Sequence, residues 1–153
     1  YDKLPWQSEL ENWLMPRMLK KIPTLGLCYG HQMIAHMFGG KISYTDEDKA
    51  KQSGFREVAI SPNGPFPKSN SNLIVSHNET VSTVPNDMEI FGSSPKISTD
   101  ALSHKDLPVW TFQSHPEATE QFLINQNIPF KNDPKNYLSG ILIIKHFLEY
   151  SIG

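Results

Sequence analysis

The spacing of apolar residues along the chain changes repeatedly between helical and extended periodicity. Helical spacing predicts helices at residues 5–21, 32–38, 117–124 and 136–150. Short apolar or alternating runs predict strands at residues 22–27, 41–44, 55–60, 72–76, 88–91, 99–102 and 109–112. Charged residues mark a loop at 45–53, and clustered Pro, Gly, Ser and Asn mark another at 61–72. This mixture of elements predicts an α/β protein.

The predicted strand at residues 22–27 is apolar throughout and does not alternate. Such a run is typical of a strand buried on both faces, as in a parallel sheet covered by helices. The chain has 153 residues, which is the length of one domain, and 38% of them are hydrophobic. That fraction favours a globular fold over disorder. We therefore expect a single domain over residues 1–153.

Acidic and basic residues nearly balance, with 14 Lys and Arg against 16 Asp and Glu and a net charge of −2. From this balance we expect no surface for nucleic acid or for an anionic membrane. The longest apolar run, residues 141–144, is too short to span a membrane. One cysteine cannot form an internal disulfide, which indicates a reducing compartment, so we expect a cytoplasmic protein.

Residues 24–40 place a cysteine at a sharp turn between a predicted strand and a predicted helix. Cys28 lies between Gly26 and Gly30, the spacing of a nucleophile elbow, which exposes its nucleophile on a strained turn above a sheet. The partial positive charge at the N-terminus of the following helix would stabilise a thiolate. The backbone N–H of Tyr29 is placed to donate to an oxyanion. A lone cysteine is more often a small buried hydrophobic residue, but the two glycines favour a nucleophile.

A candidate base for Cys28 follows the last predicted strand. Pro116 keeps His115 extended, because the residue before a proline avoids the helical region. Residues two apart in an extended segment point the same way, so Glu117 can orient the ring of His115. The sequence therefore predicts a triad of nucleophile, base and orienting carboxylate in Cys28, His115 and Glu117.

His77 ends another predicted strand, and strand ends line the ligand crevice of open α/β sheets. A substrate-binding role and a loop-packing role are both open for this residue. The other histidines do not have the spacing of a helical metal pair, and the sequence contains no His-Glu-x-x-His motif. With a single cysteine and no ligand cluster, we expect no metal site.

Three motifs share their order and distances with a known family. They are GLCYGHQ at residues 26–32, VSHNETV at 75–81 and FQSHPE at 112–117. Together they resemble the class I glutamine amidotransferases, and within that family the stand-alone proteins similar to the amidotransferase domain of GMP synthase. The resemblance spans most of the chain, and the helices on either side of the motifs also fit it.

The resemblance implies a reaction that needs no cofactor. Cys28 would attack the side-chain amide of glutamine, or of a related γ-glutamyl compound, and form a γ-glutamyl thioester. His115 would pass a proton to the leaving ammonia and then activate water, while Glu117 would hold the ring of His115. The ammonia would pass to an acceptor on a separate synthetase subunit.

The resemblance also implies the residues that bind the substrate. Tyr29 would supply an oxyanion N–H, and Gln32 would contact the glutamine. Ser76, His77 and Asn78 match the family segment whose backbone receives the amino-acid end of glutamine. The implied fold is a flavodoxin-like, three-layer α/β sandwich with a mostly parallel sheet and helices on both faces.

The chain departs from the family pattern in its N-terminal part. The family carries further strands and a glycine-rich oxyanion loop ahead of the first helix, whereas this sequence has no glycine before Gly26. We therefore expect a domain that is partial at its N-terminus, and we expect no synthetase domain after residue 153. Two alternative functions are open: a γ-glutamyl peptidase or hydrolase with the same triad, and an inactive truncated remnant or binding module.

Overall fold

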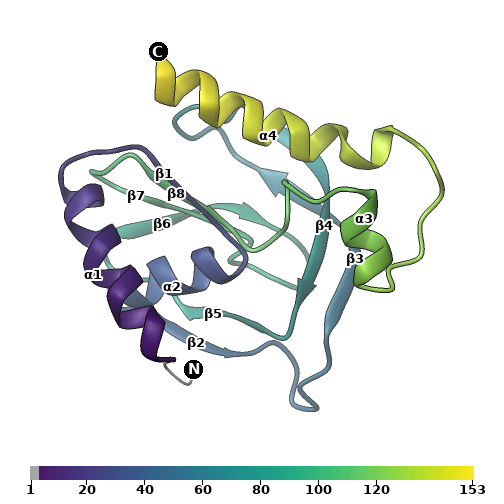
Figure 1. Cartoon of the computed structure of the whole chain (residues 1–153), viewed down its shortest axis with the longest axis horizontal. Coiled ribbons are helices and arrows are strands. Elements are labelled where there is room, and N and C mark those ends of the chain that lie inside the picture. The colour runs from purple at the N-terminus through teal and green to yellow at the C-terminus, as the bar shows by residue number, and fades with distance from the viewer. Residues whose placement is uncertain (1–3) are drawn as a thin grey trace.

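A computed structural model describes residues 4–153 and contains four helices and eight strands in that range (Figure 1). The helices are α1 (Pro5–Leu19), α2 (Tyr29–Met37), α3 (Glu120–Asn125) and α4 (Lys135–Ile152). The strands are β1 (Thr24–Leu27), β2 (Lys41–Tyr44), β3 (Gln52–Ile60), β4 (Ser69–His77), β5 (Glu79–Thr83), β6 (Met88–Ser93), β7 (Ala101–His104) and β8 (Val109–Phe112). Every predicted helix and strand is present, with shifted ends.

Six strands form one sheet in the order β1-β8-β7-β6-β3-β4. Within the described range only β1 and β8 pair in parallel, and the other four pairings of this sheet are antiparallel. The expectation of a mostly parallel sheet is therefore wrong for this part of the chain. The reason is the length of the connections: β3 to β4 and β6 through β8 are joined by turns, whereas a parallel pair needs a long crossover.

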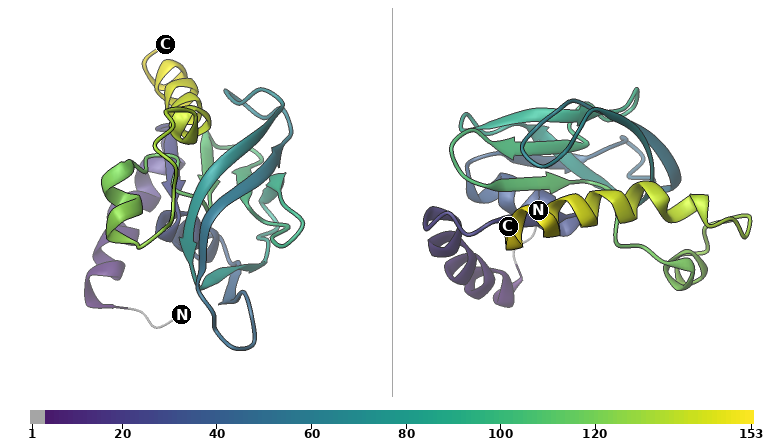
Figure 2. Two further views of the ribbon diagram at one scale, coloured as in Figure 1. Left: turned by 90° about the vertical axis from the view of Figure 1, so that its right-hand side faces the viewer. Right: turned by 90° about the horizontal axis from the view of Figure 1, so that it is seen from above.

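The hairpin of β3 and β4 is longer than the sequence predicts. The strand residues that the prediction left out are polar, so they do not show the apolar pattern of a strand. Pairing runs from Gln52 opposite His77 to Ile60 opposite Ser69, so nine residues of each strand are matched. Two stretches assigned to loops, residues 52–53 and 69–71, belong to these strands. The two strands form a long, twisted ribbon at one edge of the sheet (Figure 2).

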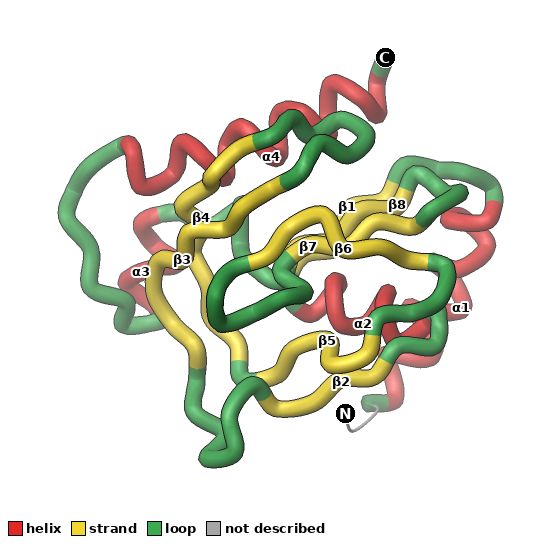
Figure 3. Tube along the Cα trace, turned by 180° about the vertical axis from the view of Figure 1, so that it is seen from behind, coloured by secondary structure: helices red, strands yellow, loops and turns green. Residues whose placement is uncertain are grey.

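A second, two-stranded sheet pairs β2 with β5 in antiparallel fashion. It lies apart from the six-stranded sheet and beside α2 (Figure 3). The sequence analysis did not predict β5, since its Glu-Thr-Val-Ser-Thr sequence contains one strongly apolar residue. That residue, Val81, is buried and packs with Ile34 of α2 in one cluster.

Side chains that alternate along β8 show that helices cover both faces of the sheet. Val109 belongs to a buried cluster with Met18 of α1 and Ile34 of α2. The next residue, Trp110, points to the opposite face and joins a cluster with Ile143 of α4. Strands β1, β7 and β8 accordingly lie between α4 on one side and α1 and α2 on the other (Figure 1). The expected α/β sandwich with helices on both faces is confirmed.

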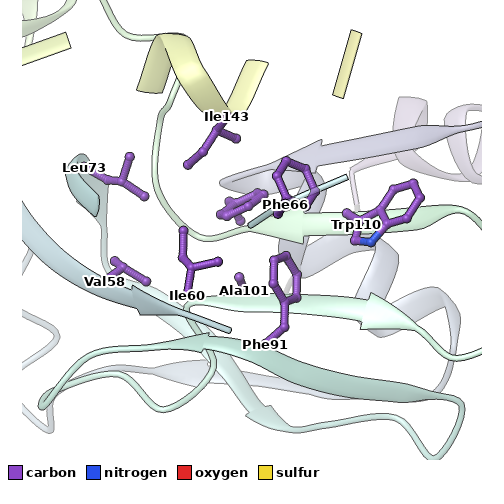
Figure 4. Close-up of a cluster of buried hydrophobic side chains, with 9 residues drawn as sticks. Val58, Ile60, Phe66, Leu73, Phe91, Ala101, Trp110 and Ile143 are labelled. Atoms are coloured by element: carbon purple, nitrogen blue, oxygen red, sulfur yellow. The ribbon is translucent and has the colours of Figure 1, made fainter. Parts of the chain in front are cut away.

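The cluster under α4 is the aromatic part of the core (Figure 4). Phe112 is fully buried, and its ring centroid lies 5.2 Å from that of Phe66 and 5.3 Å from that of Phe91. Both pairs meet edge to face, an arrangement that adds to the free energy gained by burial. This packing holds the end of β8, which carries the third motif.

Candidate active site

The turn after β1 places Cys28 in a strained backbone conformation at the start of α2. Its φ is +47° and its ψ is −98°, a region that residues with a side chain seldom adopt. The backbone N–H of Cys28 donates to the carbonyl of Phe112 over 2.8 Å, which ties the turn to β8. A strained residue between a strand and a helix has the backbone geometry of a nucleophile elbow, as the sequence predicts.

The two glycines that flank Cys28 differ in how much space they leave. A Cβ on Gly26 would lie 2.9 Å from the carbonyl oxygen of Gly30 and 2.7 Å from the Cδ1 atom of Ile34. A Cβ on Gly30 would meet no atom within 4 Å. Close packing of strand and helix therefore requires glycine at position 26. At position 30 the described residues leave room for a side chain.

His115 lies beyond the end of β8, in the turn before α3. Its backbone N–H donates to the carbonyl of Ile74 over 2.8 Å, which fixes the turn against β4. The ring nitrogen Nδ1 lies 2.7 Å from Oε1 of Glu117. The His115 ring also packs on Phe122, with 4.6 Å between the centroids. Because Nδ1 faces Glu117, Nε2 is the nitrogen available to the sulfur of Cys28.

The charge state of His115 follows from its two partners. Burial by itself would lower the pKa of His115, but hydrogen bonds to Cys28 and Glu117, together with their negative charges, raise it to about 9. His115 is therefore an imidazolium at neutral pH. An imidazolium beside the sulfur favours a thiolate and can give a proton to a leaving group.

A pocket of about 360 Å³ opens beside Cys28. It is lined by Cys28, Tyr29, Gln32, Tyr44, Ser76, His77, Asn78 and Glu79. The structure thus brings together the predicted nucleophile and all five residues expected to bind substrate. Tyr44 and Glu79 were missed by the sequence analysis, because they reach the pocket on β2 and β5, and β5 itself was not predicted. His115 and Glu117 do not line the pocket. His115 is bonded to Cys28, and Glu117 is bonded to His115.

The ring of His77 is held inside the protein. Burial, reinforced by the positive charge of Arg56, lowers the pKa of His77 to about 4, although a hydrogen bond to the Glu79 carbonyl opposes the shift. The ring is therefore neutral: Nδ1 donates to that carbonyl over 2.8 Å, and Nε2 accepts from Arg56 over 3.1 Å. Both nitrogens are used in holding the turn between β4 and β5, which favours the packing role for this side chain.

Arg56 and Asp100 form an ion pair beneath His77. Their atoms Nη1 and Oδ1 are 2.8 Å apart, and the two side chains are 11% and 1% exposed. Burial raises the pKa of Asp100, and the charge and hydrogen bond of Arg56 oppose that rise. Neither residue was a sequence candidate. The sequence signal that could have identified this pair was Arg56, a charged residue within the alternating pattern of β3.

The side chains of Ser76 and Asn78 bond to neighbouring loops. The Ser76 hydroxyl donates to Gln126 over 3.0 Å, and the Asn78 amide donates to the carbonyl of Lys49 over 2.9 Å. Their side chains are thereby held in the surrounding structure, so the backbone of this segment is the part suited to contact a ligand. Tyr29 turns its side chain toward α1, where its hydroxyl accepts a hydrogen bond from Gln7.

His31 lies one turn into α2 and is fully buried. Burial is the main cause that lowers the pKa of His31 to about 3. Its Nδ1 atom lies 2.8 Å from the hydroxyl of Thr111 on β8. This contact, with the bond from Cys28 to Phe112, ties the first turn of α2 to the sheet.

Residues 4–153 contain no group of three or more His, Cys, Asp or Glu side chains that could hold a metal ion. A search of the same residues for a helix long and apolar enough to cross a membrane finds none.

The fold and the elbow define a class of protein, and the comparisons with known proteins agree. Residues 5–128 match the model of the family described as "Glutamine amidotransferase class-I". The chain therefore belongs to the class I glutamine amidotransferase family.

Among individual relatives, the glutamine-hydrolysing subunit of GMP synthase recurs. The one from Methanosphaera stadtmanae is 36% identical over 98 residues, which cover 63% of this chain and 52% of the relative. The one from Methanocaldococcus jannaschii is 32% identical over 100 residues, with the same coverage. The matched part of this chain thus spans about half the length of these relatives.

Solved structures show the same fold at low sequence identity. A glutamine amidotransferase from Thermotoga maritima aligns with a TM-score of 0.76 at 19% identity and covers 97% of this chain and 70% of its own. One from Methylobacillus flagellatus aligns with a TM-score of 0.77 at 17% identity, with 99% and 70% covered. These likenesses support the fold alone.

Proposed function

We propose that this chain carries the glutaminase site of a glutamine amidotransferase. The single observation that carries the proposal is the strained Cys28 at the mouth of a polar pocket, with the His115–Glu117 pair behind it. The family match supports the side-chain amide of glutamine, or a γ-glutamyl relative of it, as the substrate. The names of the relatives make a separate synthetase chain the natural acceptor of ammonia.

In the proposed reaction the Cys28 thiolate attacks the amide carbon of the glutamine side chain. The carbonyl oxygen takes up negative charge, and the N–H of Tyr29, in the first turn of α2, donates to it. His115 gives its proton from Nε2 to the amide nitrogen, which leaves as ammonia, so that a γ-glutamyl thioester and a neutral imidazole remain. Water then gives a proton back to Nε2 and attacks the thioester, which releases glutamate and regenerates the thiolate.

Glu117 stabilises the imidazolium, and it keeps the proton of the neutral imidazole on Nδ1, because its carboxylate accepts from Nδ1–H. The pocket supplies polar groups for the amino-acid end of glutamine through Gln32 and the backbone of residues 76–78. Cys28 is a free cysteine. A free thiol of this kind requires reducing conditions, and we propose that the protein works in the cytoplasm.

The test is covalent labelling with a glutamine-like electrophile such as diazo-oxo-norleucine, followed by intact mass measurement. We expect one adduct, which excess glutamine prevents and which Cys28→Ala removes. Glutamine-dependent release of ammonia should disappear in the same variant. Ammonia release that survives Cys28→Ala would overturn the mechanism.

A second measurement separates glutaminase from γ-glutamyl hydrolase activity. Glutamine and a γ-glutamyl dipeptide are compared at equal concentration, and kcat/KM is expected to favour glutamine. A folded wild-type chain that forms no adduct and hydrolyses neither compound would contradict the proposal.

A further inference from the structure

We infer that Gln113 is a second amide of this site, which orients the side chain of Gln32 and donates a hydrogen bond to the sulfur of Cys28. Gln113 follows β8 directly and lies within the third motif, but the sequence analysis assigned it no role. The part of the inference that concerns Gln32 rests on the proposed function. The part that concerns the sulfur does not.

Gln113 is a polar side chain held entirely inside the protein, with 0% of its surface exposed. Burying an amide without hydrogen bonds is costly, so its partners are informative. Its backbone N–H donates to the carbonyl of Asp100 over 2.8 Å, and the residue before it, Phe112, accepts from the N–H of Cys28. The backbone at this point is therefore fixed relative to the elbow.

The atoms of the two amides can be assigned from one carbonyl group. One terminal atom of Gln32 lies 2.7 Å from the backbone oxygen of Glu79. A carbonyl oxygen only accepts, so this atom of Gln32 is the nitrogen Nε2. The same nitrogen lies 3.3 Å from the end of Gln113, which must then be the oxygen Oε1. The Gln113 nitrogen is consequently the atom 3.9 Å from the sulfur of Cys28.

This arrangement decides what Gln32 offers to a ligand. Both N–H groups of its amide are occupied, one by Glu79 and one by Gln113. Its oxygen is the remaining polar atom, and Gln32 lines the pocket. The pocket therefore meets a hydrogen-bond acceptor at this position, which fits an ammonium or an amide N–H of the substrate. Without Gln113 the Gln32 amide could rotate and present a donor.

The arrangement also decides which form of the sulfur is favoured. The backbone oxygen of Ser76, 3.8 Å from Sγ, can interact only with the protonated thiol, because it has no hydrogen to donate. The N–H of Gln113 favours the thiolate, since hydrogen bonds to an ionised acceptor are the stronger ones. Gln113 thus acts with His115 to stabilise the reactive form of Cys28.

The test uses the rate at which iodoacetamide alkylates the protein between pH 5 and pH 10. The sequence contains one cysteine, so alkylation of this chain reports on Cys28 alone. We expect Gln113→Met, which keeps the length of the side chain but removes both hydrogen bonds, to raise the pH midpoint by about one unit. That shift is a tenfold fall in the acid dissociation constant of the thiol. Gln113→Glu should raise the midpoint further, because it places a carboxylate beside the sulfur.

The matched control is Gln121→Met, since Gln121 is exposed and its amide bonds to Asn125. It should leave the alkylation midpoint where it is. In glutamine hydrolysis, Gln113→Met should raise KM about tenfold through Gln32, in addition to the pH shift, and a merely structural role would not move the pH midpoint.

Folding of each variant is checked by circular dichroism before the assay. An unchanged midpoint in folded Gln113→Met would overturn the inference. If Gln113→Met does not fold, Gln113→Glu takes its place, since it keeps the shape of the side chain. An unchanged alkylation midpoint in folded Gln113→Glu would likewise overturn the inference. Alkylation requires no glutamine, so a shifted midpoint in a protein without glutaminase activity would count against the proposed function alone.

Discussion

The Nδ1 atom of His115 and the Oε1 atom of Glu117 lie 2.7 Å apart across a single proline. Glu117 is 46% exposed, whereas His115 is 16% exposed. The carboxylate therefore supports the ring from the solvent side and does not itself reach the pocket. We expect Glu117→Ala to lower kcat for glutamine hydrolysis. The fold loss should be about 10 to 100 times smaller than the fold loss in His115→Ala, as is seen for the orienting carboxylate of another triad.

Steady-state kinetics on both variants measure this difference. Glu117→Gln provides the conservative comparison, because it keeps the size of the side chain and removes the charge. Equal and complete losses in Glu117→Ala and His115→Ala would indicate that Glu117 is needed for the structure of the turn.

The raised pKa of His115, about 9, predicts the alkaline limb of the pH profile. The imidazolium of the free enzyme is the acid that protonates the leaving amide nitrogen, so kcat/KM for glutamine should fall as the pH rises through about 9. Removing the charge of Glu117 removes one cause of the raised pKa, so Glu117→Gln should move this limb to lower pH. The measurement is kcat/KM from pH 6 to pH 10, and a limb that stays in place in Glu117→Gln would contradict the charge assignment.

The buried ion pair of Arg56 and Asp100 should matter more for stability than the ion pairs at the surface. Arg56→Met leaves the buried Asp100 without its cationic partner, with the hydrogen bond of Ser94 remaining, and takes a donor from His77. We expect a loss of about 3 kcal/mol in the free energy of unfolding at pH 7, measured with urea. Adding Asp100→Asn, which is neutral, should recover part of it.

The control for this prediction is Lys96→Gln. Its ion pair with Asp46 has a similar N–O distance, 2.9 Å, but the two side chains are 50% and 31% exposed. Exposed pairs contribute about 1 kcal/mol or less. A loss in Arg56→Met no larger than in Lys96→Gln would show that the buried pair does not hold the β4–β5 turn.

Helix α4 should support the His115 turn through Gly140. A Cβ at Gly140 would lie 2.4 Å from the backbone oxygen of Pro116, and backbone cannot move aside cheaply. Gly140→Ala is therefore expected to destabilise the protein by about 2 kcal/mol, although alanine is by itself about 1 kcal/mol better in a helix. It should also lower kcat, because the displaced turn carries His115.

Gly30→Ala in α2 is the comparison, since its Cβ would meet no atom within 4 Å. Thermal unfolding should show the two substitutions changing the midpoint in opposite directions. A Gly140→Ala protein as stable as the wild type would mean that α4 can shift away from the turn.

Much of the site could be predicted from the sequence because its chemistry is local. Gly26 and Cys28 define the elbow, and Pro116 places His115 and Glu117 on one side of an extended turn. The predicted helices and strands were also present, since each depends on the periodicity of a short segment. Residues 78–83 show where this approach fails, because a polar strand such as β5 is recognisable only beside its partner.

By itself, then, the sequence determined the elbow, the His–Glu turn and the amphipathic elements of an α/β fold, because neighbours in the chain decide backbone conformation and side-chain periodicity. The tertiary structure alone decided the antiparallel sheet, the bond of His77 to Arg56 and of Arg56 to Asp100, and the contact of Gln113 with Gln32 and Cys28. These contacts join residues 21 to 85 positions apart. No local pattern encodes these contacts. A buried polar group needs a hydrogen-bond partner, but strand order and burial decide which residue becomes that partner.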